Sequence, residues 1–511
     1  MKNVRHAFFL CLTVGIFLWD IALRAVEVVN KNYLFGFDQG RDYLAAYNIV
    51  VNHKFTLIGS EIGAGSAGLN GIYHGPGYYY LIALVYLLFH GDPYEGLLLM
   101  FAFGMGTLVV TYVTAKKIFG NSVAILSLFL VGISPLIVSQ SRFMWNHHPS
   151  SFFIALVLYF AYMIPKKTRV YAPLAILTAG CIYHFELAIA VPMVLTLFLS
   201  LPLVFHIKDF KTYIYSIAAV CFAFFPFLLF DSRHGWPALH SLTNYLFGHT
   251  GSSQSISWIR LGDHTLSYLN SAANSFMFKS TFVNDRVFMI LGVGLFIALV
   301  VLAFRTKDVL LRKFFRFLLT LLLVSYGVLL FLNNSVWDYY LIHAHFVYIY
   351  VFAYGFVWLI SSWRKSVWAR IGLVILSGFL IFASWSSLER MSINIRYDLR
   401  DLGGVEKING KKIAMNYIYQ DAKGNPFSEF TFMAPIYTYP YDYLFKTYGK
   451  DTYGYVPGNA KKGLVYLLIE PDNSKPWLHK GWLETVIVGG DIIKTVKLPT
   501  GHIIQVRRFP L

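Results

Sequence analysis

Residues 1–390 alternate between long apolar stretches and short polar segments. A helix needs about 20 residues to cross the apolar core of a bilayer, and most of these stretches are long enough. The first apolar stretch follows the short basic segment 1–6. No small-residue cleavage site comes after it, so we expect a retained helix rather than a signal peptide. The pattern therefore predicts a mainly α, polytopic membrane helical bundle of about eleven spans.

Basic residues gather in the polar segments and predict the orientation of the chain. They cluster at residues 116–117, 166–169, 208–211, 305–316 and 364–370. Cytoplasmic loops carry an excess of Lys and Arg, so we expect these segments and the N-terminus in the cytoplasm. The exception is 78–89, which is apolar but short; if it crossed, 116–117 would face the wrong side. We expect this segment to lie at the outer surface or to be re-entrant.

Composition agrees with a cell-membrane protein. Hydrophobic residues make up 57% of the 511 residues, charged residues 14%, and the mean hydropathy is +0.55, which excludes an ordinary soluble enzyme. The 43 Lys and Arg exceed the 26 Asp and Glu, but the excess lies in loops of the membrane region, so we reject a nucleic-acid partner. The three cysteines lie in separate apolar segments and form neither a disulfide framework nor a metal-binding pattern.

The pattern changes after residue 390. Short β-branched runs at 412–419, 463–469, 485–488 and 502–506 are bounded by Gly, Pro, Asn and Asp and predict strands. We expect residues 391–511 to form a small extracytoplasmic α/β domain. Long external loops are expected at about 25–93 and 231–286 in the membrane region. The segment 427–455 is rich in Tyr and Phe, whose rings could stack on sugars or pack against the membrane region.

The first external loop holds the strongest candidate for chemistry. Asp38 and Asp42 are four residues apart with Arg41 beside them, so a helix would place both acids on one face. Asp38 could simply cap that helix. Charges at a membrane face are costly unless they are used, and a carboxylate here could take a proton from an attacking hydroxyl.

A second segment joins His74 through a Gly-Pro-Gly turn to Tyr78. Such a turn and its tyrosines could shape a site or only anchor the chain at headgroup depth. Further polar residues lie in other external segments. Arginines there can bind phosphate and histidines can donate to it, although snorkelling or local ion pairing would also explain them. These candidates are Arg142, Asn146, Asp231, Arg233, His234, Asp338, Tyr340 and His343.

Metal ligation has weak support in the sequence. The pairs at 147–148, at 184 and 186, and at 343 and 345 lack the spacing of known metal motifs. The chain requires no cofactor, although a divalent cation would be compatible with it.

Three motifs together resemble the GT-C membrane glycosyltransferases: Asp38-Gln39, the segment 74–80 and the segment 230–235. The nearest branch is the protein O-mannosyltransferases and lipid A aminoarabinose transferases, and the resemblance covers about the first 390 residues. It implies inverting transfer of a sugar from a polyprenyl-phosphate donor to a protein, glycolipid or glycan acceptor on the outer face. It also implies that Asp38 is the general base, that His74 shapes the site, and that Arg233 and His234 hold the leaving phosphate.

The resemblance is not complete. Gln39 stands where the mannosyltransferases often have glutamate, Gly75 replaces a proline, and Asn146 replaces an acid found in some relatives. The segment 337–340 with His343 is similar to the aromatic segment that often faces the donor. These departures leave the sugar and any metal undetermined.

Two other functions remain as alternatives: a polytopic transporter or flippase of a lipid-linked sugar, and a scaffold that binds such lipids without catalysis. A transporter would place its polar groups near the middle of the membrane and often has paired halves. Here the polar clusters gather at one face.

Overall fold

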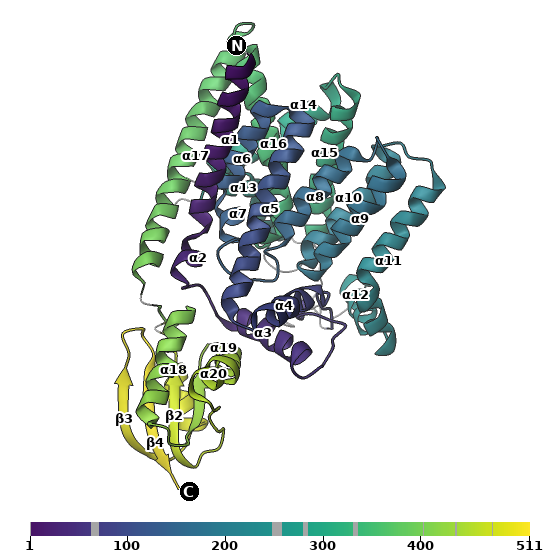
Figure 1. Ribbon diagram of the computed structural model, residues 1–511. Coiled ribbons are helices and arrows are strands. Elements are labelled where there is room, and N and C mark those ends of the chain that lie inside the picture. Colours follow the sequence, from purple (N-terminus) through teal and green to yellow (C-terminus); the bar gives the residue numbers. More distant parts are fainter. Residues whose placement is uncertain are drawn as a thin grey trace.

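The computed structural model describes residues 2–62, 71–247, 258–278, 285–330, 336–401, 403–434, 437–472 and 474–510. Figure 1 shows a helical bundle with the N-terminus at one end and a small domain holding the C-terminus at the other. This arrangement confirms the predicted fold class, a membrane-type helical bundle followed by an α/β domain.

The bundle consists of long helices lying side by side (Figure 1). Among the described residues, six are long and apolar enough to cross a membrane: α1 (Lys2–Arg24), α5 (Pro93–Phe119), α11 (Phe210–Arg233), α14 (Asp285–Arg305), α16 (Ile342–Ser362) and α17 (Val367–Arg400). Beside them lie α6 (Asn121–Ile133), α8 (Ser150–Met163), α9 (Thr168–Cys181), α10 (Leu187–Leu203) and α15 (Val309–Leu329). On α17, Trp368, Ile381 and Trp385 are each about 70% exposed or more, as expected of lipid-facing side chains.

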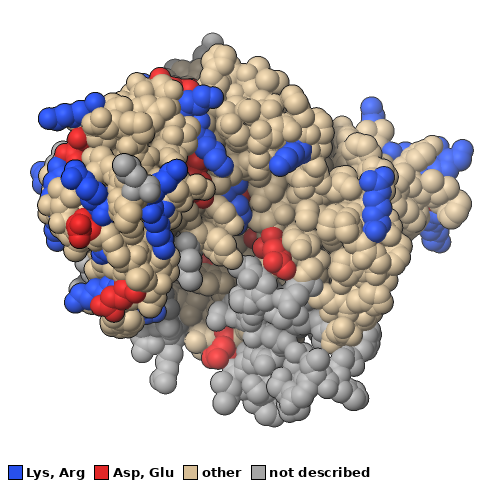
Figure 2. All heavy atoms as spheres, turned by 90° about the horizontal axis from the view of Figure 1, so that it is seen from below, with Lys and Arg blue, Asp and Glu red and all other residues tan. Residues whose placement is uncertain are grey.

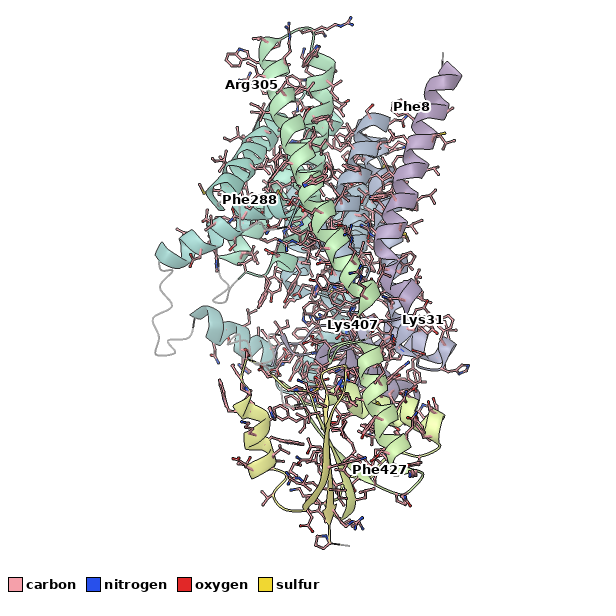
Figure 3. The ribbon with its side chains drawn as sticks, turned by 90° about the vertical axis from the view of Figure 1, so that its left-hand side faces the viewer. Phe8, Lys31, Phe288, Arg305, Lys407 and Phe427 are labelled. Atoms are coloured by element: carbon pink, nitrogen blue, oxygen red, sulfur yellow. The ribbon has the colours of Figure 1, made fainter. Side chains whose placement is uncertain are left out.

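Several basic segments meet at one end of the bundle. Arg169 forms an ion pair of 2.8 Å with Asp209, and Lys313 donates to the carbonyl of Phe205. Figure 3 places Phe8 and Arg305 at this end and Lys31 at the other. These contacts bring the segments around 166–169, 208–211 and 305–316 together, in agreement with the predicted grouping. The assignment of this end to the cytoplasm stays a prediction.

The opposite end carries several short helices. They are α2 (Val26–Asn30), α3 (Phe37–Val50), α4 (Gly77–Phe89), η2 (Ile182–His184), α12 (Pro237–Phe247) and η3 (Asp338–Leu341), while α7 (Pro135–Ser139) and the longer α13 (Trp258–Asn274) lie along the bundle. Figure 1 shows α3 and α4 beside the C-terminal domain. The position of 78–89 at the membrane surface or as a re-entrant helix stays a prediction. The segment 231–286 is not a plain loop. Its helix α13 packs on the bundle, where the Tyr268 hydroxyl donates to the carbonyl of Leu322 over 2.6 Å.

The C-terminal domain is a mixed sheet with helices. It comprises α18 (Ile408–Ala422), β1 (Ser428–Phe432), α19 (Tyr439–Leu444), the π-helical turn η4 (Phe445–Gly449), α20 (Lys450–Tyr453), β2 (Gly463–Ile469), α21 (Trp477–Thr485), β3 (Asp491–Lys497) and β4 (Ile503–Phe509). The strand order is β1-β2-β4-β3, with only the β1 and β2 pair parallel among the described strands. Figure 2 looks onto this end and shows charged side chains gathered over the domain at the left.

Two of the four predicted strands are confirmed, since 463–469 is β2 and 502–506 lies largely in β4. The prediction for 412–419 is wrong, because this run lies in α18, whose buried Ala414, Met415, Ile418 and Tyr419 follow a helical spacing. The prediction for 485–488 is also wrong. The strand in this part of the chain is β3, at 491–497. Strand β1 was not predicted, and α17 continues past residue 390 to Arg400.

One hydrophobic core joins the C-terminal domain to α3. The Tyr443 ring lies 5.1 Å from that of Tyr43 and 6.1 Å from that of Phe35, centroid to centroid. A Cβ on Gly40 would lie 2.3 Å from the backbone nitrogen of Pro440, so only glycine permits this approach. The N–H of Phe35 also donates to the carbonyl of Glu406 over 3.0 Å. The C-terminal domain therefore helps to hold α3 in place.

Candidate active site

Asp38, Arg41 and Asp42 form a compact charged group on α3. Arg41 contacts Asp38 Oδ1 through Nη1 at 2.8 Å, and Asp42 Oδ1 through Nη2 at 2.7 Å and Nε at 2.8 Å. The Asp38 side chain is 31% exposed and that of Asp42 is 1% exposed. Burial raises the pKa of Asp42 to about 7, against the opposing charge of Arg41. Only Asp38 of the two acids is open to an incoming molecule.

The first turn of α3 is fixed by Gln39. Its Oε1 accepts the N–H of Gly36 at 2.9 Å, and its Nε2 donates to the carbonyl of Met144 at 2.5 Å. This places the start of α3 against the segment between α7 and α8. Glutamate at this position could accept the first bond, but an ionised carboxylate has no proton to donate to Met144.

The Gly-Pro-Gly turn before α4 allows close contact with η2. A Cβ on Gly75 would lie 2.0 Å from His184 Nδ1, and one on Gly77 would lie 2.7 Å from Cγ of the same ring. The N–H of Gly77 donates to His184 Nδ1 over 3.2 Å. The two glycines therefore allow the start of α4 to pack closely against η2. This packing determines where the neighbouring His74 and Tyr78 lie.

His74 and the tyrosines of α4 surround the charged group. His74 is 7% exposed and Tyr78 is 2% exposed. The His74 Nδ1 and the Tyr78 hydroxyl have no hydrogen-bond partner within the described ranges. Burial, with the positive charge of Arg41 as a second cause, lowers the pKa of His74 to about 3. The Tyr79 hydroxyl interacts with Arg41. The site thus has neutral polar groups beside one fixed cation.

A cluster of rings extends the site toward η3. The rings of His147 and Tyr339 are stacked, 4.1 Å apart and inclined by 11°, and Trp145 lies 4.4 Å from His147. Burial raises the pKa of the Tyr339 phenol, and the charges of Tyr340, Glu186 and Asp38 raise this pKa further. The ring cluster is therefore within electrostatic range of the open acid of α3.

The buried histidines of the site are uncharged at neutral pH. Burial lowers the pKa of His147 well below its ordinary value, and the neighbouring His148 and His74 lower it further. Burial also lowers the pKa of His148 to about 3, while it raises that of Glu186 to about 7. These histidines can offer hydrogen bonds to a ligand but no positive charge, so an anion here depends on arginine.

Arg142 belongs to a separate ion-pair network. Its Nε donates to Glu27 at 2.8 Å, its Nη2 contacts both Glu27 and Asp398, and Lys407 lies 2.8 Å from Asp398. The network ties α2, the segment after α7, the end of α17 and the start of the C-terminal domain. Figure 3 shows Lys407 near Lys31 at this junction.

Arg142 also lines a cavity of about 390 Å³. Its walls include Leu136, Met277 and Met391, and its polar lining includes Asp338 and His345. Both ring nitrogens of His345 are buried and have no partner among the residues that the structure describes. Because Asp338 precedes Tyr339, the cavity adjoins the ring cluster beside His147.

The other predicted residues lie apart from α3 or are used locally. Asp231 caps α12 by accepting the N–H of Ala238 at 2.8 Å, and His234 Nδ1 contacts the carbonyl of Phe230 at 2.7 Å. Arg233 is exposed at the end of α11. The remaining polar candidates have partners: Asn146 donates to the Phe185 carbonyl, His343 bonds Ser325, and Asn274 donates to Asp338. Tyr340 packs edge-on against Tyr339 at 4.7 Å.

Three residues beside the site, Glu27, Glu186 and Tyr339, were not among the candidates from the sequence. Glu186 had a signal only as one of a weak pair with His184, and its carboxylate in fact accepts the N–H of Ala188 at the start of α10. Tyr339 lay within the aromatic segment 337–340 without being singled out. Glu27 had no motif that would distinguish it from other acids near the first span.

Across the described residues, no group of three or more His, Cys, Asp and Glu side chains could hold a metal ion. A divalent cation that binds here would therefore find no preformed cluster of ligands in this part of the chain. Arg41 also occupies the space between the two carboxylates of α3, where a cation shared by them would lie.

Comparisons with known proteins identify the fold. The family model described as dolichyl-phosphate-mannose-protein mannosyltransferase matches residues 73–230. No curated protein matches the sequence. ArnT from Cupriavidus metallidurans bound to undecaprenyl phosphate is similar over 99% of this chain and 98% of its own, with a TM-score of 0.55 and 11% identity. The apo ArnT structure covers the same shares, with a TM-score of 0.53 and 12% identity.

A weaker likeness is to the Archaeoglobus fulgidus oligosaccharyltransferase in complex with Zn and sulfate, with a TM-score of 0.47 and 13% identity over 97% of this chain and 73% of that one. It is too slight to support conclusions here. The family match and the two ArnT structures confirm the resemblance drawn from the motifs: the chain has the fold of the GT-C membrane glycosyltransferases.

Proposed function

We propose that this protein transfers a sugar from a polyprenyl-phosphate donor to an acceptor hydroxyl on the extracytoplasmic face, with inversion and with Asp38 as general base. The observation that carries the proposal is the difference between the two acids of α3. Asp38 is accessible and oriented by Arg41, whereas Asp42 is buried and serves to hold Arg41 from its other side. A base must be reachable by the proton that it removes.

The reaction is a single displacement. The acceptor oxygen attacks the anomeric carbon, its proton passes to the Asp38 carboxylate, and the bond from that carbon to the phosphate oxygen breaks with its electron pair on the phosphate. Arg41 orients the base through Nη1. Attack from the side opposite the leaving group gives inversion.

The cavity beside Arg142 supports binding of the donor. Its apolar wall suits the start of a lipid chain, and its polar lining suits a phosphate or sugar. Glu27 and Asp398 engage Nε and Nη2 of Arg142, so a phosphate would approach the guanidinium from its Nη1 side. The related ArnT structure holds undecaprenyl phosphate. The roles of Arg233 and His234 in holding phosphate stay predictions.

The orientation follows from the same proposal. With the basic end of the bundle in the cytoplasm, α3, the cavity and the C-terminal domain lie outside. The acceptor, whether protein, glycolipid or glycan, then approaches from the extracytoplasmic side, and the donor approaches within the bilayer.

The test is transfer by the purified full-length protein in lipid nanodiscs, with a panel of undecaprenyl-phosphate sugars and an envelope extract as acceptor. The proposal predicts a new glycosidic product and release of undecaprenyl phosphate. In parallel, the protein is reconstituted in sealed vesicles to follow movement of the labelled lipid. Movement of the lipid between leaflets without any product would support the flippase alternative.

A further inference from the structure

Three aromatic rings from two domains meet beside Asp38. Tyr437 and Tyr439 of the C-terminal domain are stacked, with centroids 5.3 Å apart and planes inclined by 11°. Phe37 of α3 lies 5.1 Å from the ring of Tyr439 and 5.9 Å from that of Tyr437. We call Phe37, Tyr437 and Tyr439 the ring platform.

The ring platform adjoins the candidate base through Arg41. The guanidinium carbon of Arg41 lies 5.8 Å from the centroid of Phe37 while Nη1 is 2.8 Å from Asp38. The platform and the open carboxylate therefore flank one cation. Because Gly40 of the same helix contacts the backbone of Pro440, the position of the two tyrosines relative to Asp38 is set by backbone packing.

The platform is open on one side. Tyr437 is 59% exposed, although aromatic rings of this domain such as Tyr441 and Tyr443 are fully buried. The buried rings account for the domain's core and its docking onto α3. Tyr437 belongs neither to the core of the domain nor to the buried rings that dock it onto α3, so its exposed face requires another explanation.

We propose that the ring platform binds a sugar ring of the acceptor, so that the C-terminal domain helps to select a carbohydrate acceptor. This inference rests on the proposed transferase function and specifies its acceptor. A pyranose presents C–H groups on its faces and hydroxyls at its edge, so its face packs on aromatic rings while an edge hydroxyl extends sideways. Next to the platform, that hydroxyl meets Asp38 and Arg41.

Acceptor binding is measured independently of transfer, by saturation-transfer NMR on the nanodisc-embedded protein. The probes are β-linked disaccharides of glucose, galactose and N-acetylglucosamine. The wild-type protein is expected to transfer saturation to sugar ring protons, Tyr437→Phe to retain this signal, and Tyr437→Ala to lose most of it. Equal signals from wild type and Tyr437→Ala, or no signal from any disaccharide, would overturn the proposal.

Trp477→Ala is the matched control, because Trp477 is an aromatic residue of the same domain with 61% exposure and lies on α21. It should keep the wild-type signal. In the transfer reaction, Tyr437→Ala should raise KM for the acceptor about five- to tenfold and leave KM for the donor unchanged. An unchanged acceptor KM would contradict the platform. If the wild type transferred no sugar, the proposed transferase function would be refuted. The NMR experiment would still test, independently, whether the platform binds a sugar.

Discussion

Two arginine clusters lie on the same side of the bundle and differ in what they can do. Arg142 is 12% exposed and is bonded to the carboxylates of Glu27 and Asp398, which are 9% and 21% exposed. Arg41 is also bonded to two carboxylates, but one of them, Asp38, is 31% exposed. The first cluster joins four segments of the chain, whereas the second lies within one helix turn.

This difference indicates which cluster stabilises the fold and which could take part in catalysis. A closed cluster whose members come from distant segments mainly fixes those segments relative to one another. An open cluster on one helix holds little together, yet it presents an oriented carboxylate to molecules that enter. Both arginines were candidates from the sequence, and only their partners and exposure distinguish them.

The largest effect on stability is expected from Arg142→Met. It would leave Glu27 and Asp398 close together without their shared cation, which costs about 3–5 kcal/mol for a buried pair. Arg41→Met should cost less, because Asp38 remains hydrated and the cluster lies within one helix, so its loss does not separate distant segments. Thermal unfolding in nanodiscs compares the two variants. A smaller loss for Arg142→Met than for Arg41→Met would contradict the division between the clusters.

Gly40→Ala should loosen the C-terminal domain from α3. The added Cβ would lie 2.3 Å from a backbone atom of Pro440, and such overpacking costs about 1–3 kcal/mol. Limited proteolysis should cut the variant faster near residues 401–407. Gly481→Ala is the control, since a Cβ there meets nothing within 4 Å, and it should be neutral or slightly stabilising. Equal cleavage of both variants would argue against close docking.

His74→Gln tests the buried neutral histidine near the open cluster. His74 has a pKa of about 3 in the folded protein and about 6.5 when unfolded, so only the unfolded chain gains a proton as the pH falls below 6.5. The wild type should therefore lose up to about 1.4 kcal/mol of unfolding free energy per pH unit relative to His74→Gln. Unfolding of both proteins between pH 7 and 5 measures this. A difference independent of pH would show that His74 is hydrated.

The bundle was predictable because apolar length and basic loops are local signals. They indicated the helical class and the division into a membrane bundle and a C-terminal domain. The C-terminal domain was harder, since the run 412–419 satisfies both strand composition and the helical spacing of Ala414, Met415 and Ile418. The run becomes a helix because the core of the domain buries these helically spaced residues on one face of α18.

The site was predictable where chemistry is concentrated in a short segment, as at 38–42. The segment could not reveal that Asp42 would be buried and Asp38 open, because the packing of α19 and α4 determines this. From the sequence, Arg142 was a candidate phosphate ligand. In the structure it is bonded to Glu27 and Asp398, which are far apart in the sequence, and no local pattern could have predicted these partners.

The most direct test of the account is the single-turnover rate of sugar transfer by Asp38→Asn and Asp42→Asn in nanodiscs. Both changes remove one carboxylate from the same helix, so the pair controls for helix damage. We predict a loss of about 10²- to 10⁴-fold for Asp38→Asn, the range for a general base, and about tenfold or less for Asp42→Asn. A rate near that of the wild type for Asp38→Asn, or a larger loss for Asp42→Asn, would contradict the assignment of the open carboxylate as the base.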